Sequence, residues 1–250
     1  ILSWIKGKGL DYGGFKLKNH QNQKINFGPI STFSSLAIVS ENRVFLKPKK
    51  MSNVEAVLYG CATPTGAGII INQIKELKKK HKVCLIGVGG VGMAALLALI
   101  KKKPKIFVIE KNKKKQQFLK KFNINLINDK EFKSYKNFFD FCIETSGSTK
   151  MIEEGFDLIK KNGKLIFASH PKNLKKIKLN PHDLISGKKI YGSWGGNCKL
   201  DSDIEKIFEY FDKKNIFSTS GKISFFNLKN INKAFNKVIS GEINRAVIKF

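Results

Sequence analysis

From residue 82 onward, short apolar runs alternate with stretches of helical periodicity. The expected strands are 83–86, 106–109, 126–127, 139–144, 164–168 and 190–193, and the expected helices between them are 91–102, 113–122 and 149–161. The run 83–86 is continuously apolar, which is typical of a strand that is covered on both faces. Strands and helices in this alternation predict an α/β domain with a parallel, doubly wound sheet.

The two flanks of this region have a different character. Residues 1–60 are rich in Gly, Asn and Lys, with strand-like pieces at 36–39 and 44–46. The C-terminal flank is expected to form a helix over 202–212, a strand over 222–226, a helix over 228–240 and a strand over 246–250. We therefore expect a central domain placed between the two ends of a second domain.

The start of the chain and its cysteines indicate where the protein is located. The chain begins with Ile1, shows no basic-then-apolar export signal, and has no apolar run near the roughly 20 residues of a membrane span. The four cysteines form no CxxC pair, which favours a reducing setting. We expect a cytoplasmic protein, treated as a possible fragment of a longer one.

The formal net charge of +28 has two possible explanations. A strongly basic chain can bind nucleic acid. However, the chain has only two arginines, Arg43 and Arg245, and its joint excess of Lys, Asn, Ile and Phe is what a biased coding composition produces. Lysines at helix ends are also favourable without any partner. We favour the compositional explanation.

A glycine motif lies between the first expected strand and the first expected helix. Gly87, Gly89 and Gly92 fit G-x-G-x-x-G, with Gly90 and Val91 inside the motif. Such a turn lets a pyrophosphate approach the backbone at a helix N-terminus. Glu110 closes the next strand, where a carboxylate can bind ribose hydroxyls. This carboxylate favours NAD over NADP, although Lys111 and the lysines at 113–115 favour a phosphate.

With these residues in view, the sequence resembles the zinc-type medium-chain alcohol dehydrogenases, and particularly their class III branch, the glutathione-dependent formaldehyde dehydrogenases. The likeness rests on the segment 60–68 (Gly-Cys-Ala-Thr-Pro-Thr-Gly-Ala-Gly) followed by the glycine motif. It extends through 31–33, 144–147, 192–196 and 241–245.

The resemblance implies a fold and an activity. It implies a Rossmann NAD-binding domain over 63–194, with a partial GroES-like β-rich catalytic domain over 1–62 and a C-terminal return into that domain over 195–250. The implied activity is hydride transfer between NAD and a primary alcohol or a hydroxymethyl-thiol, with Zn2+ as Lewis acid. The implied partner is a small-molecule alcohol, with neither a specific nucleic acid nor a membrane. A homodimer or homotetramer is implied, with the strand over 190–193 as the candidate pairing edge.

The resemblance also assigns residue roles. Cys61 matches the third ligand of the catalytic zinc, and Thr65 matches the residue that packs against the nicotinamide ring. Lys115 matches a lysine near the adenosine ribose, and Arg245 matches an arginine that neutralises the pyrophosphate. The residues expected to border the nicotinamide pocket are Phe167, Ala168 and Trp194.

This sequence also departs from the family pattern. The other two zinc ligands of the family have no counterpart, so the active site of the chain as given is expected to be incomplete. The four histidines lack ligand spacing and are expected on the surface: His20, His81, His170 and His182. Three alternatives stay open: an NAD-binding module without turnover, a zinc-independent reductase of the same superfamily, and a basic nucleic-acid-binding protein.

Overall fold

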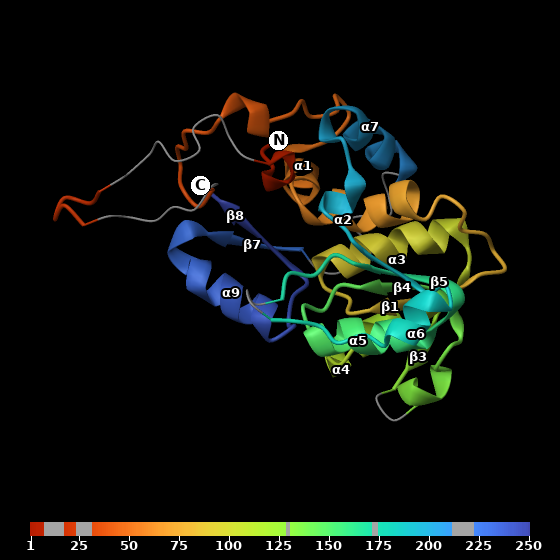
Figure 1. Cartoon of the computed structure of the whole chain (residues 1–250). Helices are drawn as coiled ribbons and strands as arrows, with labels where there is room; N and C mark the ends of the chain where they lie inside the picture. Colours follow the sequence, from red (N-terminus) through yellow and green to blue (C-terminus); the bar gives the residue numbers. More distant parts are fainter. Residues whose placement is uncertain (8–17, 24–31, 129–130, 172–174, 212–222) are drawn as a thin grey trace.

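The structure is a computed structural model that describes residues 1–7, 18–23, 32–128, 131–171, 175–211 and 223–250. Six parallel strands form one sheet in the order β3-β2-β1-β4-β5-β6 (Figure 1). The strands are β1 (Lys82–Ile86), β2 (Lys105–Ile109), β3 (Asn125–Ile127), β4 (Phe139–Glu144), β5 (Ile159–Phe167) and β6 (Lys189–Gly192). This order reverses direction between β1 and β4, as in Rossmann-like folds. The predicted α/β class with a doubly wound parallel sheet is therefore confirmed.

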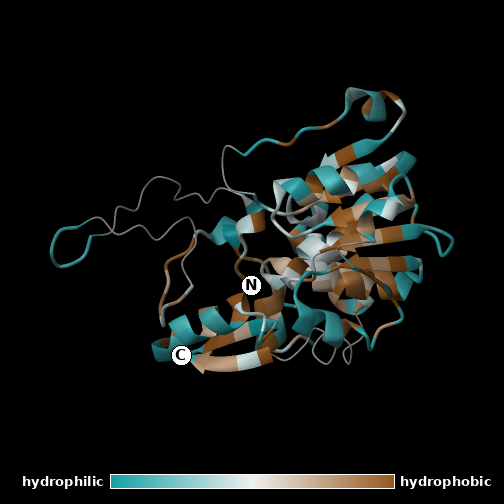
Figure 2. Cartoon of the chain, turned by 90° about the horizontal axis from the view of Figure 1, so that it is seen from below, coloured by the Kyte–Doolittle hydropathy of each residue, from teal (hydrophilic) through white to brown (hydrophobic). Residues whose placement is uncertain are grey.

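The continuous apolar strands are buried on both faces. On β1, Val83 and Leu85 belong to one core cluster, and Cys84 and Ile86 belong to a second. Helix α3 (Gly90–Lys102) covers the first cluster and helix α5 (Thr149–Leu158) covers the second, on opposite sides of the sheet (Figure 1). Figure 2 shows the strands of the sheet as mainly hydrophobic and several outer loops as hydrophilic.

The remaining helices surround these layers. They are α1 (Asn53–Tyr59), α2 (Ala62–Gly68), α4 (Lys113–Leu119), α6 (Pro181–Ile185), α7 (Leu200–Tyr210) and α9 (Ile231–Ile239). Short helical turns are η1 (Trp4–Lys6), η2 (Glu41–Arg43), η3 (Ile69–Gln73), η4 (Phe132–Tyr135), η5 (Gly195–Asn197) and η6 (Leu228–Asn230). Helices α1, α2 and α7 lie on the α3 side of the sheet (Figure 1), so the first core cluster is the larger one.

Two helices are shorter than the sequence predicts. Helix α5 ends at Leu158 instead of 161, because Ile159 turns into extended backbone and pairs with Phe139 of β4. A turn at Asn162–Gly163, with Asn162 at φ +63°, lies inside the segment of β5 and does not end the helix. Helix α4 ends at Leu119 instead of 122.

The N-terminal flank lacks the expected strands in the part that the structure describes, and the C-terminal flank forms most of its expected elements. Within the described residues, the pieces 36–39 and 44–46 form no strand, and Val44 makes only an isolated bridge to Leu2. The helix expected over 228–240 consists of η6 followed by α9. Residues 31, 212 and 222, which belong to expected motifs or elements, lie outside the described residues.

A small second sheet lies beside the main one (Figure 1). Strands β7 (Ile223–Asn227) and β8 (Arg245–Lys249) are parallel, and α9 connects them. This connection brings the guanidinium of Arg245, at the start of β8, against Gly90 at the N-terminus of α3.

No single described helix is both long and apolar enough to cross a membrane. Helix α1 and the run Ala62–Gln73 meet the length and composition requirement only when taken together, with a bend of 58° between them.

Candidate cofactor-binding site

The turn between β1 and α3 contains the predicted glycine motif. Gly87 has a φ of +80° and donates its N–H to the carbonyl oxygen of Ile109 at 2.9 Å. A Cβ on Gly92 would lie 2.1 Å from the carbonyl oxygen of Gly87 and 2.7 Å from Oγ1 of Thr145. A Cβ on Gly89 would meet no atom within 4 Å. The first and third glycines therefore close the turn, and the second faces open space at the start of α3.

The guanidinium of Arg245 lies against this turn. A Cβ on Gly90 would be 2.0 Å from Nη2 of Arg245, so the guanidinium is pressed onto the glycine backbone. Within the described part of the chain, this group has no hydrogen-bond or ion-pair partner. Burial lowers the pKa of Arg245 from its usual value, and the Cys61 sulfur partly opposes this effect. A desolvated cation at a helix N-terminus favours binding of an anion.

A hollow opens beside Arg245 and the glycine turn. Its lining comes from α1, α2, α3, the segment after α7 and the start of β8: Leu58, Thr63, Gly89, Gly90, Met93, Ala94, Leu97, Phe211, Asn244 and Arg245. Most of these side chains are apolar, so the polar groups of the hollow are concentrated where the guanidinium meets the α3 N-terminus. Small-ligand sites commonly have this composition.

Glu110 follows β2 and supports the glycine turn directly. Its Oε2 accepts the N–H of Val88 at 2.8 Å, and its Oε1 accepts the N–H of Asn112 at 2.9 Å. The residue is 8% exposed. Each carboxylate oxygen keeps a lone pair beyond these two bonds, so Glu110 both shapes the turn and retains capacity to accept a hydroxyl. Lys115 lies in the first turn of the neighbouring α4 and is partly buried.

Cys61 and Thr65 lie at the start of α2. Cys61 is the residue that precedes the helix, and its carbonyl oxygen accepts both the N–H and the hydroxyl of Thr65, at 3.2 and 2.8 Å. The indole N–H of Trp4 donates to Sγ of Cys61 at 3.0 Å. A Cβ on Gly66 would lie 2.1 Å from the carbonyl oxygen of Val91, so α2 packs backbone to backbone on α3.

The described residues do not by themselves form the zinc site that the resemblance implies. No group of three or more His, Cys, Asp or Glu side chains among them is placed to hold a metal ion. A catalytic zinc needs three protein ligands, and Cys61 is a single thiol that is hydrogen-bonded to an indole. The described residues therefore supply one thiol of the three ligands that a catalytic zinc needs.

The other expected nicotinamide neighbours lie at the carboxyl ends of β5 and β6. Phe167 ends β5, Ala168 follows it, and Trp194 follows β6. The carbonyl oxygen of Phe167 accepts the N–H of Ser193 at 2.8 Å, and Ala168 is buried directly after it. Trp194 is 58% exposed and donates its indole N–H to the carbonyl oxygen of Ile5 at 3.2 Å. These residues lie at the sheet edge where open α/β sheets bind ligands.

The sequence analysis missed a buried polar cluster at the same edge. Glu144 ends β4 and is fully buried, and its carboxylate accepts the N–H of Ser146 at 2.6 Å. The hydroxyls of Ser146 and Ser169 donate to the same carboxylate. A Cβ on Gly87 would lie 3.1 Å from Ser146, so this cluster packs against the glycine turn. The signal was an acidic residue at the end of a mainly apolar strand.

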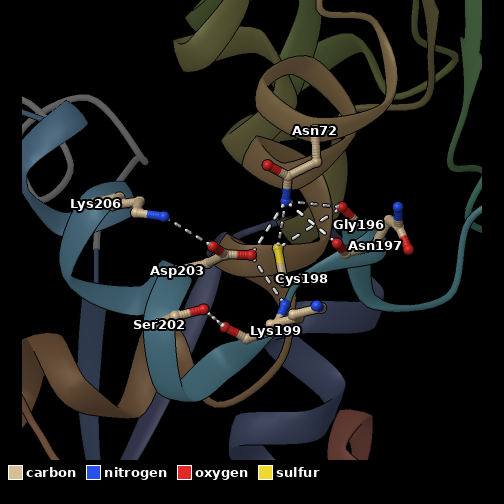
Figure 3. A network of polar contacts seen from close by, with 8 residues as sticks. All are labelled: Asn72, Gly196, Asn197, Cys198, Lys199, Ser202, Asp203 and Lys206. Atoms are coloured by element: carbon tan, nitrogen blue, oxygen red, sulfur yellow. Dashed lines mark hydrogen bonds and ion pairs between the residues drawn. The ribbon is translucent and has the colours of Figure 1, made fainter.

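A polar network fixes α2 and η3 to the connection between β6 and α7 (Figure 3). The amide nitrogen of Asn72 lies 3.3 Å from the carbonyl oxygen of Asn197, and 3.5 Å from Sγ of Cys198 and from Oδ2 of Asp203. Burial raises the pKa of the Cys198 thiol to about 12, so it stays protonated at neutral pH.

Comparisons with known proteins agree with this geometry. A family model described as "Zinc-binding dehydrogenase" matches residues 90–213. The S-(hydroxymethyl)glutathione dehydrogenase of Saccharomyces cerevisiae is 25% identical over 98% of this chain and 67% of its own length. The class-3 alcohol dehydrogenase of Drosophila melanogaster is 26% identical over 95% of this chain and 66% of its own length.

A solved structure shows the same fold. The benzyl alcohol dehydrogenase of Acinetobacter calcoaceticus superposes with a TM-score of 0.75 at 24% identity, covering 85% of this chain and 61% of its own length. The chain thus spans about two thirds of the length of these relatives. The glycine turn, the six-stranded parallel sheet and the family match agree, and the chain belongs to the zinc-binding medium-chain alcohol dehydrogenase family.

Proposed function

We propose that this chain binds NAD beside the N-terminus of α3 and belongs to an oxidoreductase that transfers a hydride between NAD and a primary alcohol or hydroxymethyl-thiol. The observation that carries the proposal is the desolvated guanidinium of Arg245, which lies against Gly90 and has no hydrogen-bond or ion-pair partner among the described residues. The names of the yeast and fly relatives support the substrate class.

The diphosphate of the cofactor is assigned to the glycine turn. The open space at Gly89 lets a phosphate approach the backbone N–H groups at the start of α3. Arg245 adds charge-assisted hydrogen bonds from the opposite side. The oxygens of the two phosphates therefore accept hydrogen bonds from the guanidinium of Arg245, which has no such acceptor among the described residues.

The adenosine ribose is assigned to Glu110. The carboxylate is fixed by the N–H groups of Val88 and Asn112 and can accept a ribose hydroxyl through its remaining lone pairs. A 2′-phosphate at this position would be repelled, which supports NAD over NADP. Lys115 is proposed to lie near the same ribose.

The nicotinamide end is assigned to Thr65, Phe167, Ala168 and Trp194. Thr65 is held by two hydrogen bonds to Cys61 and is 4% exposed, so its side chain is pre-positioned. Bound NAD supplies the hydride acceptor. A zinc ion would need two protein ligands besides Cys61, and this proposal assigns none.

The flanking segments are proposed to belong to a catalytic domain of the GroES-like kind, over 1–62 and 195–250. Large apolar side chains on these segments are exposed in the structure, among them Leu36, Ile38, Leu46 and Ile239. We propose that these side chains pack against other parts of that domain.

One observation favours a second candidate function, NAD binding without turnover. The Trp4 indole N–H donates a hydrogen bond to the sulfur of Cys61. Cys61 is the one zinc ligand that the resemblance places in the described residues. Formation of NADH from NAD and a primary alcohol by the purified chain would contradict this second candidate.

Calorimetric titration with NAD and with NADP tests the main proposal. We expect NAD to bind more tightly than NADP, and Arg245→Ala to weaken NAD binding by about tenfold or more. Lys249→Ala is the matched control, because Lys249 is an exposed cation on the same strand, and it should leave binding unchanged. A chain that melts cooperatively but binds neither nucleotide would refute the proposal.

A further inference from the structure

One peptide group of the glycine turn is held at both of its ends by side chains that follow the two strands beside β1. The hydroxyl of Thr145, after β4, donates to the carbonyl oxygen of Gly87 at 2.8 Å. The carboxylate of Glu110, after β2, accepts the N–H of Val88 at 2.8 Å. This carbonyl and this N–H belong to one planar peptide bond, so they rotate only together. We call this group the Gly87–Val88 peptide.

The backbone of Thr145 places its side chain beside the end of β1. Its N–H donates to the carbonyl oxygen of Ile86 at 2.9 Å. Its hydroxyl also lies 3.2 Å from that oxygen, but the shorter distance to Gly87 identifies Gly87 as the main acceptor. A valine at this position would keep the branched shape of the side chain and lose the donor.

The segment that carries Thr145 is fixed by the buried carboxylate of Glu144. This carboxylate accepts the N–H of Ser146 at 2.6 Å and the hydroxyls of Ser146 and Ser169. These bonds join the end of β4 to the chain that follows β5. Thr145, between Glu144 and Ser146, is therefore a firm support for the peptide that it holds.

The orientation of the Gly87–Val88 peptide determines where the next backbone N–H groups lie. A Cβ on Gly92 would be 2.1 Å from the Gly87 carbonyl oxygen, so α3 begins directly against this oxygen. The open backbone at Gly89 follows only one residue after the peptide. Rotation of the peptide would therefore displace Gly89 and the first N–H groups of α3.

We propose that Thr145 is a positioning residue for the cofactor diphosphate. Its hydroxyl holds the Gly87–Val88 peptide, together with Glu110, in the orientation that opens the start of α3 to a phosphate. The inference rests on the proposed function, which assigns the diphosphate to this turn. Thr145 is assigned no contact with the cofactor, so its effect passes entirely through the backbone.

Calorimetric titration of Thr145→Val with NAD tests the proposal. We expect the affinity for NAD to fall about three- to tenfold, which is the effect of one net hydrogen bond. Thr145→Ser keeps the hydroxyl and should restore most of the affinity. Inorganic pyrophosphate, measured as a competitor of NAD, should lose affinity by a similar factor, because the loss lies in the diphosphate contact. Weakened NAD binding with unchanged pyrophosphate binding would overturn the proposal.

Ser186→Ala is the matched control. The Ser186 hydroxyl donates to the carbonyl oxygen of Asp183 at 2.7 Å, at the end of α6, so this change removes the same kind of bond elsewhere. It should leave NAD binding unchanged. If Thr145→Val does not melt cooperatively, Thr145→Ala decides, and an unaltered affinity for NAD in that variant counts against the proposal.

A double-mutant cycle with Glu110→Ala tests whether the two side chains act on one peptide. Removing either support frees the same plane, so the second removal has less left to disturb. We expect the loss of NAD affinity in the double variant to be at least about twofold smaller than the product of the two single losses. A loss equal to that product would contradict joint positioning by Thr145 and Glu110.

Titration of the unaltered chain distinguishes the two proposals. If it melts cooperatively but binds neither NAD nor pyrophosphate, the proposed function is refuted, and the role of Thr145 is refuted with it. If the unaltered chain binds NAD and Thr145→Val binds it equally well, only the role of Thr145 is refuted.

Discussion

The hydroxyl of Tyr59 is buried at the end of α1 without a hydrogen-bond partner among the described residues. Burial raises the pKa of this phenol, so the group is neutral. The Tyr59 ring also packs edge-on against Phe208, with centroids 6.0 Å apart. Tyr59→Phe removes the unsatisfied hydroxyl and keeps the ring. We expect the free energy of unfolding to stay constant or to rise by up to about 1 kcal/mol in urea denaturation.

Tyr210 provides the matched control for this experiment. Its hydroxyl donates to the carbonyl oxygen of Ala98 at 3.2 Å. Tyr210→Phe should therefore lower the free energy of unfolding by about 1 kcal/mol. Equal destabilisation by the two changes would show that the Tyr59 hydroxyl has a partner in solution.

At the level of residues, the sequence predicts local chemistry better than contacts between distant segments. The motif of Gly87, Gly89 and Gly92 is contained in six residues; Gly87 and Gly92 close the turn, and Gly89 faces open space. Two contacts that shape the site join distant segments: Trp4 with Cys61, which was not predicted, and Arg245 with Gly90, which only the family resemblance indicated. Both join segments whose meeting depends on the whole fold.

At the level of elements, α1 depends on a local signal that the sequence analysis did not use. Ser52 Oγ accepts the N–H of Glu55 at 3.2 Å, and the Glu55 carboxylate accepts the N–H of Ser52 at 2.6 Å. This is a capping box. Ser52→Ala should lower the free energy of unfolding by about 1 kcal/mol in urea denaturation.

Ser134 serves as the control for Ser52, because it is exposed, lies within η4 and caps no helix. Ser134→Ala should change the free energy of unfolding by less than about 0.5 kcal/mol. A Ser52→Ala variant as stable as Ser134→Ala would mean that tertiary packing alone holds α1.

Other differences between sequence and structure have tertiary causes. Helix α2 contains two glycines and a proline, so local propensity argues against it, yet every residue in it is buried. Its packing on α3 compensates for the weak propensity. Helix α5 ends early because pairing of Ile159 with Phe139 replaces the last helical turn. The strands β1 and β2 were predictable because burial on both faces makes each run continuously apolar after its first lysine.

At the level of the whole molecule, β6 is an edge of the main sheet and pairs only with β5 among the described strands. We expect two copies of the chain to associate through this edge. Tyr191→Glu, at a side chain that is 45% exposed on β6, should shift sedimentation toward the monomer. Tyr191 is a better test site than Ile190, because Ile190 packs against the second core cluster and its loss would damage the fold.

Phe225→Glu on β7 is the control for this experiment, since Phe225 is similarly exposed on the other sheet. It should leave the sedimentation coefficient unchanged. A Tyr191→Glu protein with the mass of the unaltered chain would contradict pairing through β6.

The close approach of α2 and α3 also has a mechanical consequence. At Gly66, the two helix backbones leave no space for even a methyl group, so neither can slide or tilt without the other. The Cys61 sulfur at the start of α2 and the open backbone at Gly89 at the start of α3 therefore keep a constant separation. If the molecule opens and closes around a ligand, the hinge lies outside this helix pair, and Cys61 and Gly89 move together.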